Sequence, residues 1–201
     1  MNFAAAQAEV VGITKRPEKV AETASALNRA LSLWTLKANW KKDLVEQQLP
    51  IDPALYGQTI DFSALVLPAV PFVRFRKFKY IRPTGQRYYL RTIEPEQVFV
   101  PGGRIQTNRY YVAGNSITFT LSQLDSSLEV GYYQYAPLLV GGTDTHWMLD
   151  MIPWVVTEKA AAMILKSIGD DQSAAFYEAS SMEFFLTARR DFEDQVAAEA
   201  S

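Results

Sequence analysis

The sequence predicts an α+β protein in which N- and C-terminal helices form one helical bundle and an antiparallel β lobe is inserted between them. Apolar residues recur at helical spacing near both ends of the 201-residue chain, whereas residues 60–137 alternate in polarity and are rich in aromatic and β-branched types. Neither helical end can bury its apolar stripe alone, so packing the two ends together is the economical solution. The expected parts are a bundle of residues 1–58 and 138–201 and an inserted lobe of residues 59–137.

The N-terminal part is predicted to hold a short helix or turn over residues 3–11 and then a long helix. Pro17 suits the first position of that helix. Beyond it the apolar residues recur every three or four positions, at Val20, Ala24, Leu27, Leu31, Trp34 and Ala38. The apolar series continues to Leu49, where a proline follows, unless the helix breaks near Asn39. The stripe is expected to pack against the helix that starts at Pro153.

The middle of the chain is predicted to form an antiparallel sheet or sandwich-like lobe of five or six strands. Residues 72–81 are rich in aromatic and β-branched types, and residues 128–134 alternate in polarity. The clearest hairpin spans residues 110–121. Its centre, Gly114-Asn115, supplies the positive φ angles that a tight hairpin turn needs.

The C-terminal part is predicted to hold two helices. Pro153 starts a compact helix that Gly169 ends as a C-terminal cap. The last helix starts at about Asp171. Its expected apolar face consists of Ala175, Ala179, Met182 and Leu186. Helical periodicity weakens after that, so residues 190–201 are expected to become ordered only against a partner.

Composition narrows the class of protein. A hydrophobic fraction of 48% with 21% charged residues is ordinary for a globular protein. The absence of cysteine excludes disulfides, thiolate metal sites and cysteine nucleophiles. No apolar run approaches the roughly 20 residues that span a bilayer, and the N-terminus has no basic lead and soon meets Glu9, so neither a membrane span nor a signal peptide is expected. A net charge of −2 argues against a general nucleic-acid coat.

Charge is unevenly distributed along the chain. No acidic residue lies between Phe62 and Ile93, and seven basic residues do: Arg74, Arg76, Lys77, Lys79, Arg82, Arg87 and Arg91. From Asp170 to Ser201 the balance reverses, because eight acidic residues accompany only two arginines. One interpretation is two solvated surfaces. The other is a basic lobe and an acidic end that contact different neighbours, or opposite ends of identical neighbours.

No set of polar residues has the pattern of an active site. His146 is the only histidine and could act as a general base with Asp144 or Asp150, but a loop histidine more often bonds backbone groups. Glu94 and Glu96 flank a proline, which is typical of an exposed turn. Metal-ligand spacing is absent, and the glycine pairs lack the lysine of a phosphate loop. The sequence therefore predicts no catalytic, cofactor or metal site, and a protein that is not an enzyme.

Tyrosines are crowded in the predicted lobe. Five of them lie close in sequence: Tyr110, Tyr111, Tyr132, Tyr133 and Tyr135. Aromatic strips can bind sugars or stack on bases. On alternating strands they more often fill a core on one face and an interface on the other.

Three passages carry a resemblance to a known family. They are residues 14–18 (TKRPE) leading into 26–30 (ALNRA) and 40–44 (WKKDL); residues 110–115 (YYVAGN); and residues 131–137 (GYYQYAP) followed by 143–150 (TDTHWMLD) and a helix ending at 168–170 (IGD). Together they resemble the head-to-tail adaptor proteins of tailed bacteriophages, also called connector or head-completion proteins. The passages span most of the chain in the expected order. The long basic run matches no motif of that family.

The resemblance implies a structural virion protein. Such adaptors form a homo-oligomeric ring, usually of twelve copies, beneath the portal protein, and they join the capsid to a tail or nozzle protein. Double-stranded DNA passes through the lumen of the ring without sequence-specific contacts. The family carries no catalytic residues and no cofactor and contacts no membrane. Its members are located in the neck of the virion, and in the host cytoplasm during assembly.

Two sets of residues are the candidate contacts for this role. The expected portal-docking residues in the C-terminal segment are Arg189, Arg190, Phe192 and Val196. The expected subunit or tail interface consists of Arg74, Arg76, Lys77, Lys79, Arg82, Tyr132, Tyr133 and Tyr135. The alternative function is a binding module whose aromatic β lobe recognises a glycan or a protein partner.

Overall fold

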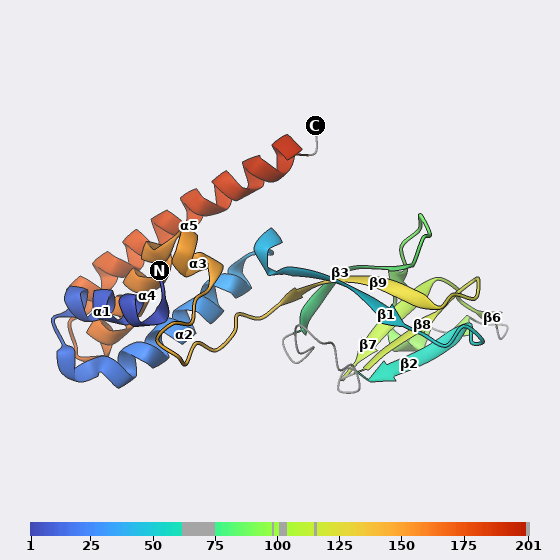
Figure 1. The fold of residues 1–201 in the computed structure, drawn as a ribbon, viewed down its shortest axis with the longest axis horizontal. Coiled ribbons are helices and arrows are strands. Elements are labelled where there is room, and N and C mark those ends of the chain that lie inside the picture. Colours follow the sequence, from blue (N-terminus) through green and yellow to red (C-terminus); the bar gives the residue numbers. More distant parts are fainter. Residues whose placement is uncertain (62–74, 98, 101–103, 115, 200–201) are drawn as a thin grey trace. The chain divides into compact units, whose positions relative to one another are not determined.

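The chain has an α+β fold, as the sequence predicted, and divides into two compact units. The computed structural model describes residues 1–61, 75–97, 99–100, 104–114 and 116–199. Residues 1–42 and 136–201 form the helical unit, and residues 43–135 form the β unit. Figure 1 shows helices from both ends of the chain in the first unit and the strands in the second.

Five α-helices build the described part of the helical unit. They are α1 (Phe3–Thr14), α2 (Val20–Lys37), α3 (Trp147–Met151), α4 (Pro153–Ser167) and α5 (Asp171–Glu199), with a 3-10 turn, η1 (Pro17–Lys19), before α2. Helix α4 is the central one, because it contacts α1, α2, α3 and α5. Since α4 derives from the C-terminal half and α2 from the N-terminal half, the predicted joint bundle is confirmed.

The core of the helical unit lies between α2 and α4. Leu27, Leu31 and Trp34 are buried there with Ala161, as the spacing predicted. The indole N–H of Trp34 donates to the backbone oxygen of Val155 at 2.8 Å. The same indole stacks on the ring of Phe185 from α5, with ring centroids 4.5 Å apart. Trp34 therefore links the three longest helices of the unit.

The long N-terminal helix is shorter than predicted. It ends at Lys37, because Ala38 has an extended backbone, and the indole N–H of Trp40 donates back to the oxygen of Trp34 at 3.3 Å. The chain then passes through a 3-10 turn, η2 (Lys41–Asp43), into a strand over residues 44–50. The prediction of a helix that continues to Leu49 is thus wrong, and the alternative, a break near Asn39, is confirmed. The first unit boundary lies at 42/43 rather than 58/59, and the second lies at 135/136 rather than 137/138.

The described residues of the β unit form nine strands. They are β1 (Leu44–Pro50), β2 (Gly57–Asp61), β3 (Phe75–Pro83), β4 (Arg91–Thr92), β5 (Phe99–Val100), β6 (Arg104–Ile105), β7 (Arg109–Ala113), β8 (Ser116–Thr120) and β9 (Ser127–Gln134), and a 3-10 turn, η5 (Pro95–Gln97), follows β4. The sheets have the orders β1-β9-β3, β2-β8-β7-β4 and β5-β6, and all pairs are antiparallel except the short β4–β7 pair. The predicted hairpin is β7–β8, and Gly114 has the expected positive φ of 56°. Asn115 lies outside the described residues.

Strand β9 sets the two faces of the first sheet. Its residues Leu128, Val130 and Tyr132 are buried in the core of the β unit, together with residues of the neighbouring strands and of β8. The alternate residues of β9 point to the opposite face, because side chains alternate along a strand. That opposite face, called here the outer face of the first sheet, carries Glu129, Gly131 and Tyr133.

Helix α5 differs from the prediction in two ways. Over residues 171–192, its buried residues are Ala174, Ser181, Phe185 and Ala188, whereas the predicted apolar residues Ala175, Ala179 and Leu186 are exposed. The stacking of Phe185 on Trp34 fixes this rotation, which the run of apolar residues 184–186 leaves ambiguous. The helix also continues to Glu199 instead of losing order near residue 190.

Candidate interaction surfaces

The outer face of the first sheet is held together by one tyrosine that crosses all three strands. Tyr80 of β3 lies opposite Gly131 of β9, and Glu46 of β1 lies opposite the same glycine. A Cβ atom at Gly131 would lie only 2.5 Å from Cε1 of Tyr80, so the ring covers the glycine. The Tyr80 hydroxyl donates to Glu46 at 2.8 Å, and its ring meets Tyr89 edge-on at 5.6 Å. Burial, and then the hydrogen bond to Glu46, raise the pKa of Tyr80 to about 12.

Two of the predicted basic interface residues are engaged within the same face. Arg82 forms an ion pair with Glu129 on the adjacent strand, and its guanidinium lies 6.0 Å from the ring centre of Tyr80. Arg76 lies over the ring of Tyr133 at 5.5 Å. Both arginines therefore stabilise the sheet, since cross-strand pairs of this kind contribute to its stability.

The remaining predicted cations differ in position. Lys77 and Lys79 are exposed on β3, and Arg74 lies outside the described residues. Arg76 and Lys77 line an open groove of about 430 Å³ in the β unit, called here the β3–β7 groove. Lys79 is not among its lining residues, although it lies on the same strand.

The β3–β7 groove combines charge with aromatic rings. Its other lining residues are Phe78 from β3; Thr92, Ile93, Glu94 and Pro95; and Tyr110, Tyr111 and Val112 from β7. Phe78 and Tyr110 pack edge to face at 5.9 Å. Burial raises the pKa of Tyr110, so its hydroxyl stays protonated and can donate at neutral pH. A groove that combines cations, a carboxylate and aromatic rings suits a polypeptide segment.

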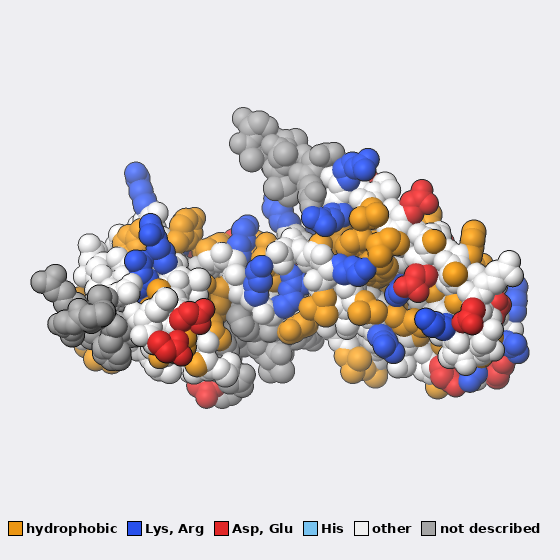
Figure 2. Space-filling view, turned by 180° about the vertical axis from the view of Figure 1, so that it is seen from behind, with side chains coloured by type: hydrophobic (Ala, Val, Ile, Leu, Met, Phe, Trp, Pro, Cys, Tyr) orange, Lys and Arg blue, Asp and Glu red, His pale blue; other side chains and the backbone are white. Residues whose placement is uncertain are grey.

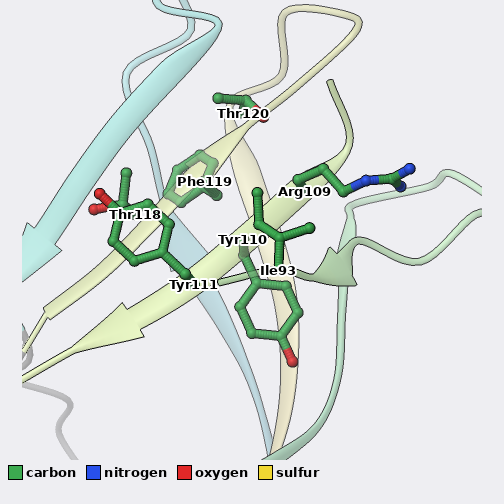
Figure 3. A pocket seen from close by; sticks show the side chains of 7 residues that line it. All are labelled: Ile93, Arg109, Tyr110, Tyr111, Thr118, Phe119 and Thr120. Carbon is green, nitrogen blue, oxygen red and sulfur yellow. The ribbon is translucent and has the colours of Figure 1, made fainter. Parts of the chain in front are cut away.

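A second hollow nearby is too small for a ligand. It is a cavity of about 10 Å³ lined by Ile93, Arg109, Tyr110, Tyr111, Thr118, Phe119 and Thr120. That volume corresponds to about one water molecule. Figure 3 shows the Arg109 guanidinium pointing away from the other lining side chains.

The predicted tyrosine interface is mostly covered. Tyr132 is fully buried in the core of the β unit, so the expectation that it is a surface contact is wrong. Tyr133 is only 8% exposed and lies beneath Arg76. Tyr135 alone of the three is exposed. Alternation decides this outcome, because the inward position on β9 falls on Tyr132.

The C-terminal candidate residues are also divided. Phe192 is packed inside the helical unit, with ring centroids 5.5 Å from Trp40 and 5.6 Å from Trp147. The expectation that Phe192 is a free anchor for a partner is therefore wrong. Arg189 and Arg190 are exposed on α5, and the side chain of Val196 lies outside the described residues.

The helical unit displays apolar side chains that sequence reasoning missed. Met151, Trp154 and Phe184 are 49%, 53% and 42% exposed, and the last two rings lie 6.1 Å apart. Leu138 and Val140 are 71% and 76% exposed. In Figure 2 apolar side chains occupy contiguous areas of the surface, with Lys and Arg side chains among them. The sequence signal that could have indicated this exposed surface is that Phe184 falls at the edge of the apolar stripe of α5.

His146 has a structural place. It precedes α3, and its Nδ1 accepts the N–H of Met148 at 3.3 Å, which caps the helix. Burial lowers the pKa of His146 to about 4, so the ring is neutral at pH 7. The carboxylate of Asp150 instead accepts hydrogen bonds from the N-terminal ammonium and from Thr145, and these lower its pKa.

Among the residues that the structure describes, no group of three or more His, Cys, Asp and Glu side chains is placed to hold a metal ion. No helix in the described ranges is both long and apolar enough to cross a membrane.

No family model matches the sequence, and a search of curated proteins found no significant match.

Proposed function

We propose that the protein is a structural component of a tailed-bacteriophage virion, a head-to-tail adaptor that forms a ring beneath the portal and passes DNA through its lumen. The observation that carries this proposal is that each unit has a contact surface of its own kind. The helical unit displays exposed aromatic and aliphatic side chains, and the β unit has a groove with cations beside tyrosines. A part that joins two assemblies needs separate surfaces of different chemistry for its different neighbours.

The charge distribution supports a DNA conduit that does not grip its cargo. Each phosphate contact adds affinity through counterion release and would slow the passage of DNA. The chain has a net charge of −2 and a pI of about 5.5. In the basic run, Arg82 is paired with a carboxylate and Arg76 lies on an aromatic ring. These contacts favour a protein-facing rather than a DNA-facing role for the run.

In this proposal the two units have different partners. The end of α5, with the exposed Arg189 and Arg190 and the acidic residues that follow, attaches to the portal. The β3–β7 groove receives a segment of a neighbouring subunit or of the tail. Complementary charge at such rims steers association and fixes register more than it adds affinity.

Electron microscopy of the full chain mixed with its candidate portal tests the proposal. The expected result is a second ring bound to one end of the portal. Lys77→Glu should weaken the contact made by the groove, whereas Lys79→Glu, the same charge change on the same strand outside the groove, should leave it intact. Failure of the wild-type chain to bind any portal, together with binding to a defined glycan, would instead support the binding module.

A further inference from the structure

The segment that leads from β9 back into the helical unit presents two aliphatic side chains on a rigid support. Leu139 is buried, while its neighbours Leu138 and Val140 are the two most exposed large apolar residues in the described part of the chain. The side-chain amide of Asn28 on α2 donates to the oxygen of Leu139 at 2.9 Å, and its oxygen accepts the N–H of Leu139 at 2.8 Å. Two hydrogen bonds thus hold the segment against α2 in the manner of a paired strand.

A carboxylate fixes the other end of this segment. Asp144 accepts the N–H groups of Val140 and Gly141, both at 2.8 Å, and these bonds lower its pKa. The backbone oxygens of Gly142 and Asp144 accept the first N–H groups of α1, those of Ala4 and Phe3. Because the backbone is bonded on both sides, Leu138 and Val140 are presented with little conformational freedom. We call this pair the aliphatic ridge.

The same unit also exposes a pair of aromatic rings, those of Trp154 and Phe184. Trp154 stands in the first turn of α4 and Phe184 in the middle of α5, and their rings are inclined by only 36°. Met151 is exposed three positions before Trp154. We call these three residues the aromatic patch. A pair of rings offers a broad apolar surface, whereas the ridge offers two narrow aliphatic side chains.

We propose that the aliphatic ridge of one copy of this chain packs on the aromatic patch of the next copy, so that identical copies associate head to tail. This inference rests on the proposed ring and identifies its subunit contact. No charged residue lies in residues 136–143, and the patch residues are also uncharged, so the two surfaces match in polarity. Because ridge and patch lie on different elements, the contact is heterologous, and a heterologous contact repeats until the rotation closes a ring.

The size of the two surfaces fits association that depends on ring closure. An aromatic side chain buries about 150–250 Å² when fully covered, so Trp154 and Phe184 at about half exposure offer on the order of 200 Å². A stable interface buries about 800 Å² on each partner. The ridge and patch are thus the size of an interface centre, so we expect an isolated pair of copies to separate easily. In a closed ring every copy makes the contact twice.

The absence of cysteine allows a direct test with the full chain. Val140→Cys and Phe184→Cys proteins, one of them tagged, are mixed and treated with a short bifunctional thiol reagent. The expected product is the mixed dimer, with little dimer from either protein alone. Adding Leu138→Asp to the Val140→Cys protein should remove most of that product. Leu124→Cys in place of Val140→Cys is the matched control, because Leu124 is exposed but belongs to the β unit.

Three outcomes would overturn the inference. These are equal cross-linking by the Leu124 control, dominant dimers of one single-cysteine protein, and no mixed dimer in rings that electron microscopy shows to be assembled. The last outcome would leave the proposed function standing. Conversely, efficient mixed dimers from a chain that binds no portal would uphold the contact and refute the adaptor function.

Discussion

A single methyl group added to β9 tests how the outer face of the first sheet is held together. In Gly131→Ala the new Cβ would lie 2.5 Å from Cε1 and 2.8 Å from Cδ1 of Tyr80. Carbon atoms in contact prefer about 3.5–4.0 Å, so the ring must swing away. It then loses its hydrogen bond to Glu46 and its contact with Tyr89.

The magnitude follows from these two contacts. The hydrogen bond contributes about 0.5–1.5 kcal/mol and the aromatic pair about 0.5–1.5 kcal/mol. Alanine in a strand is more favourable than glycine by about 0.5–1 kcal/mol, which offsets part of the loss. Gly131→Ala should therefore lower the free energy of unfolding by about 1 kcal/mol. With Tyr80→Ala already present nothing obstructs the methyl group, and the same change should raise that free energy by about 0.5–1 kcal/mol.

The aromatic residues provide separate optical probes for the assay. All four tryptophans belong to the helical unit, and nine of the ten tyrosines belong to the β unit. Chemical unfolding of the four proteins of the cycle is followed by the near-ultraviolet circular dichroism of tyrosine and by tryptophan fluorescence. The tyrosine transition should shift. If both units unfold together, the two signals coincide and the cycle is calculated from their common transition.

Positions 80 and 131 should be energetically coupled. The expected coupling free energy is about 2 kcal/mol, from the two contacts that only the tyrosine makes. If Gly131→Ala destabilises the protein equally with and without Tyr80, the ring is not the obstacle. The loss would then arise in the backbone of β9.

Further outcomes are expected for Trp34, for His146 and for the end of α5. Trp34→Ala should lower the free energy of unfolding by about 3–5 kcal/mol, whereas Trp34→Phe, which keeps one aromatic ring but loses the bond to Val155 and part of the buried volume, should cost less in the same denaturant titration. The pKa of His146 is about 4 in the folded protein and 6.5 in the unfolded chain, so the unfolded chain binds the proton more readily between these values. The free energy of unfolding should therefore be largest above pH 6.5 and fall by up to about 3 kcal/mol as the pH drops to 4. His146→Gln should flatten this pH dependence. Removing residues 194–201 should leave thermal unfolding unchanged but abolish co-sedimentation with portal rings, and undiminished binding would show that the end of α5 has no such role. A deletion that also takes Phe192 should lower stability by about 2 kcal/mol, half the value for a fully buried phenylalanine.

The sequence predicted correctly those elements that depend on residues close together in the chain. The stripe on α2, the start of α4 at Pro153 and the β7–β8 hairpin around Gly114 all follow from periodicity, proline and glycine. Residues 44–50 were misassigned because Leu44 and Leu49 fit a helical series as well as a strand. Their strand forms through pairing with β9, about ninety positions later in the chain, and a propensity argument does not contain that pairing.

The contact surfaces were harder to predict than the fold. Phe192 resembled a free anchor because its partners, Trp40 and Trp147, lie far from it in sequence. The basic run resembled one surface, yet Arg82 is paired with Glu129 whereas Lys77 lines the β3–β7 groove. Whether an apolar side chain such as Trp154 remains exposed depends on which other helices cover it. That cannot be predicted from the sequence of its own helix.

The pairing of β1 with β9 has a consequence for how this protein can change over time. Leu44 and Tyr133 lie opposite each other in that ladder, so the chain enters and leaves the β unit on adjacent strands. Antiparallel partners are about 5 Å apart, a gap that a short turn can span. Residues 43–135 thus form a cassette that can be lengthened, replaced or deleted without pulling α2 and α3 apart. We therefore expect contacts carried by the cassette to change more readily than those carried by the helices.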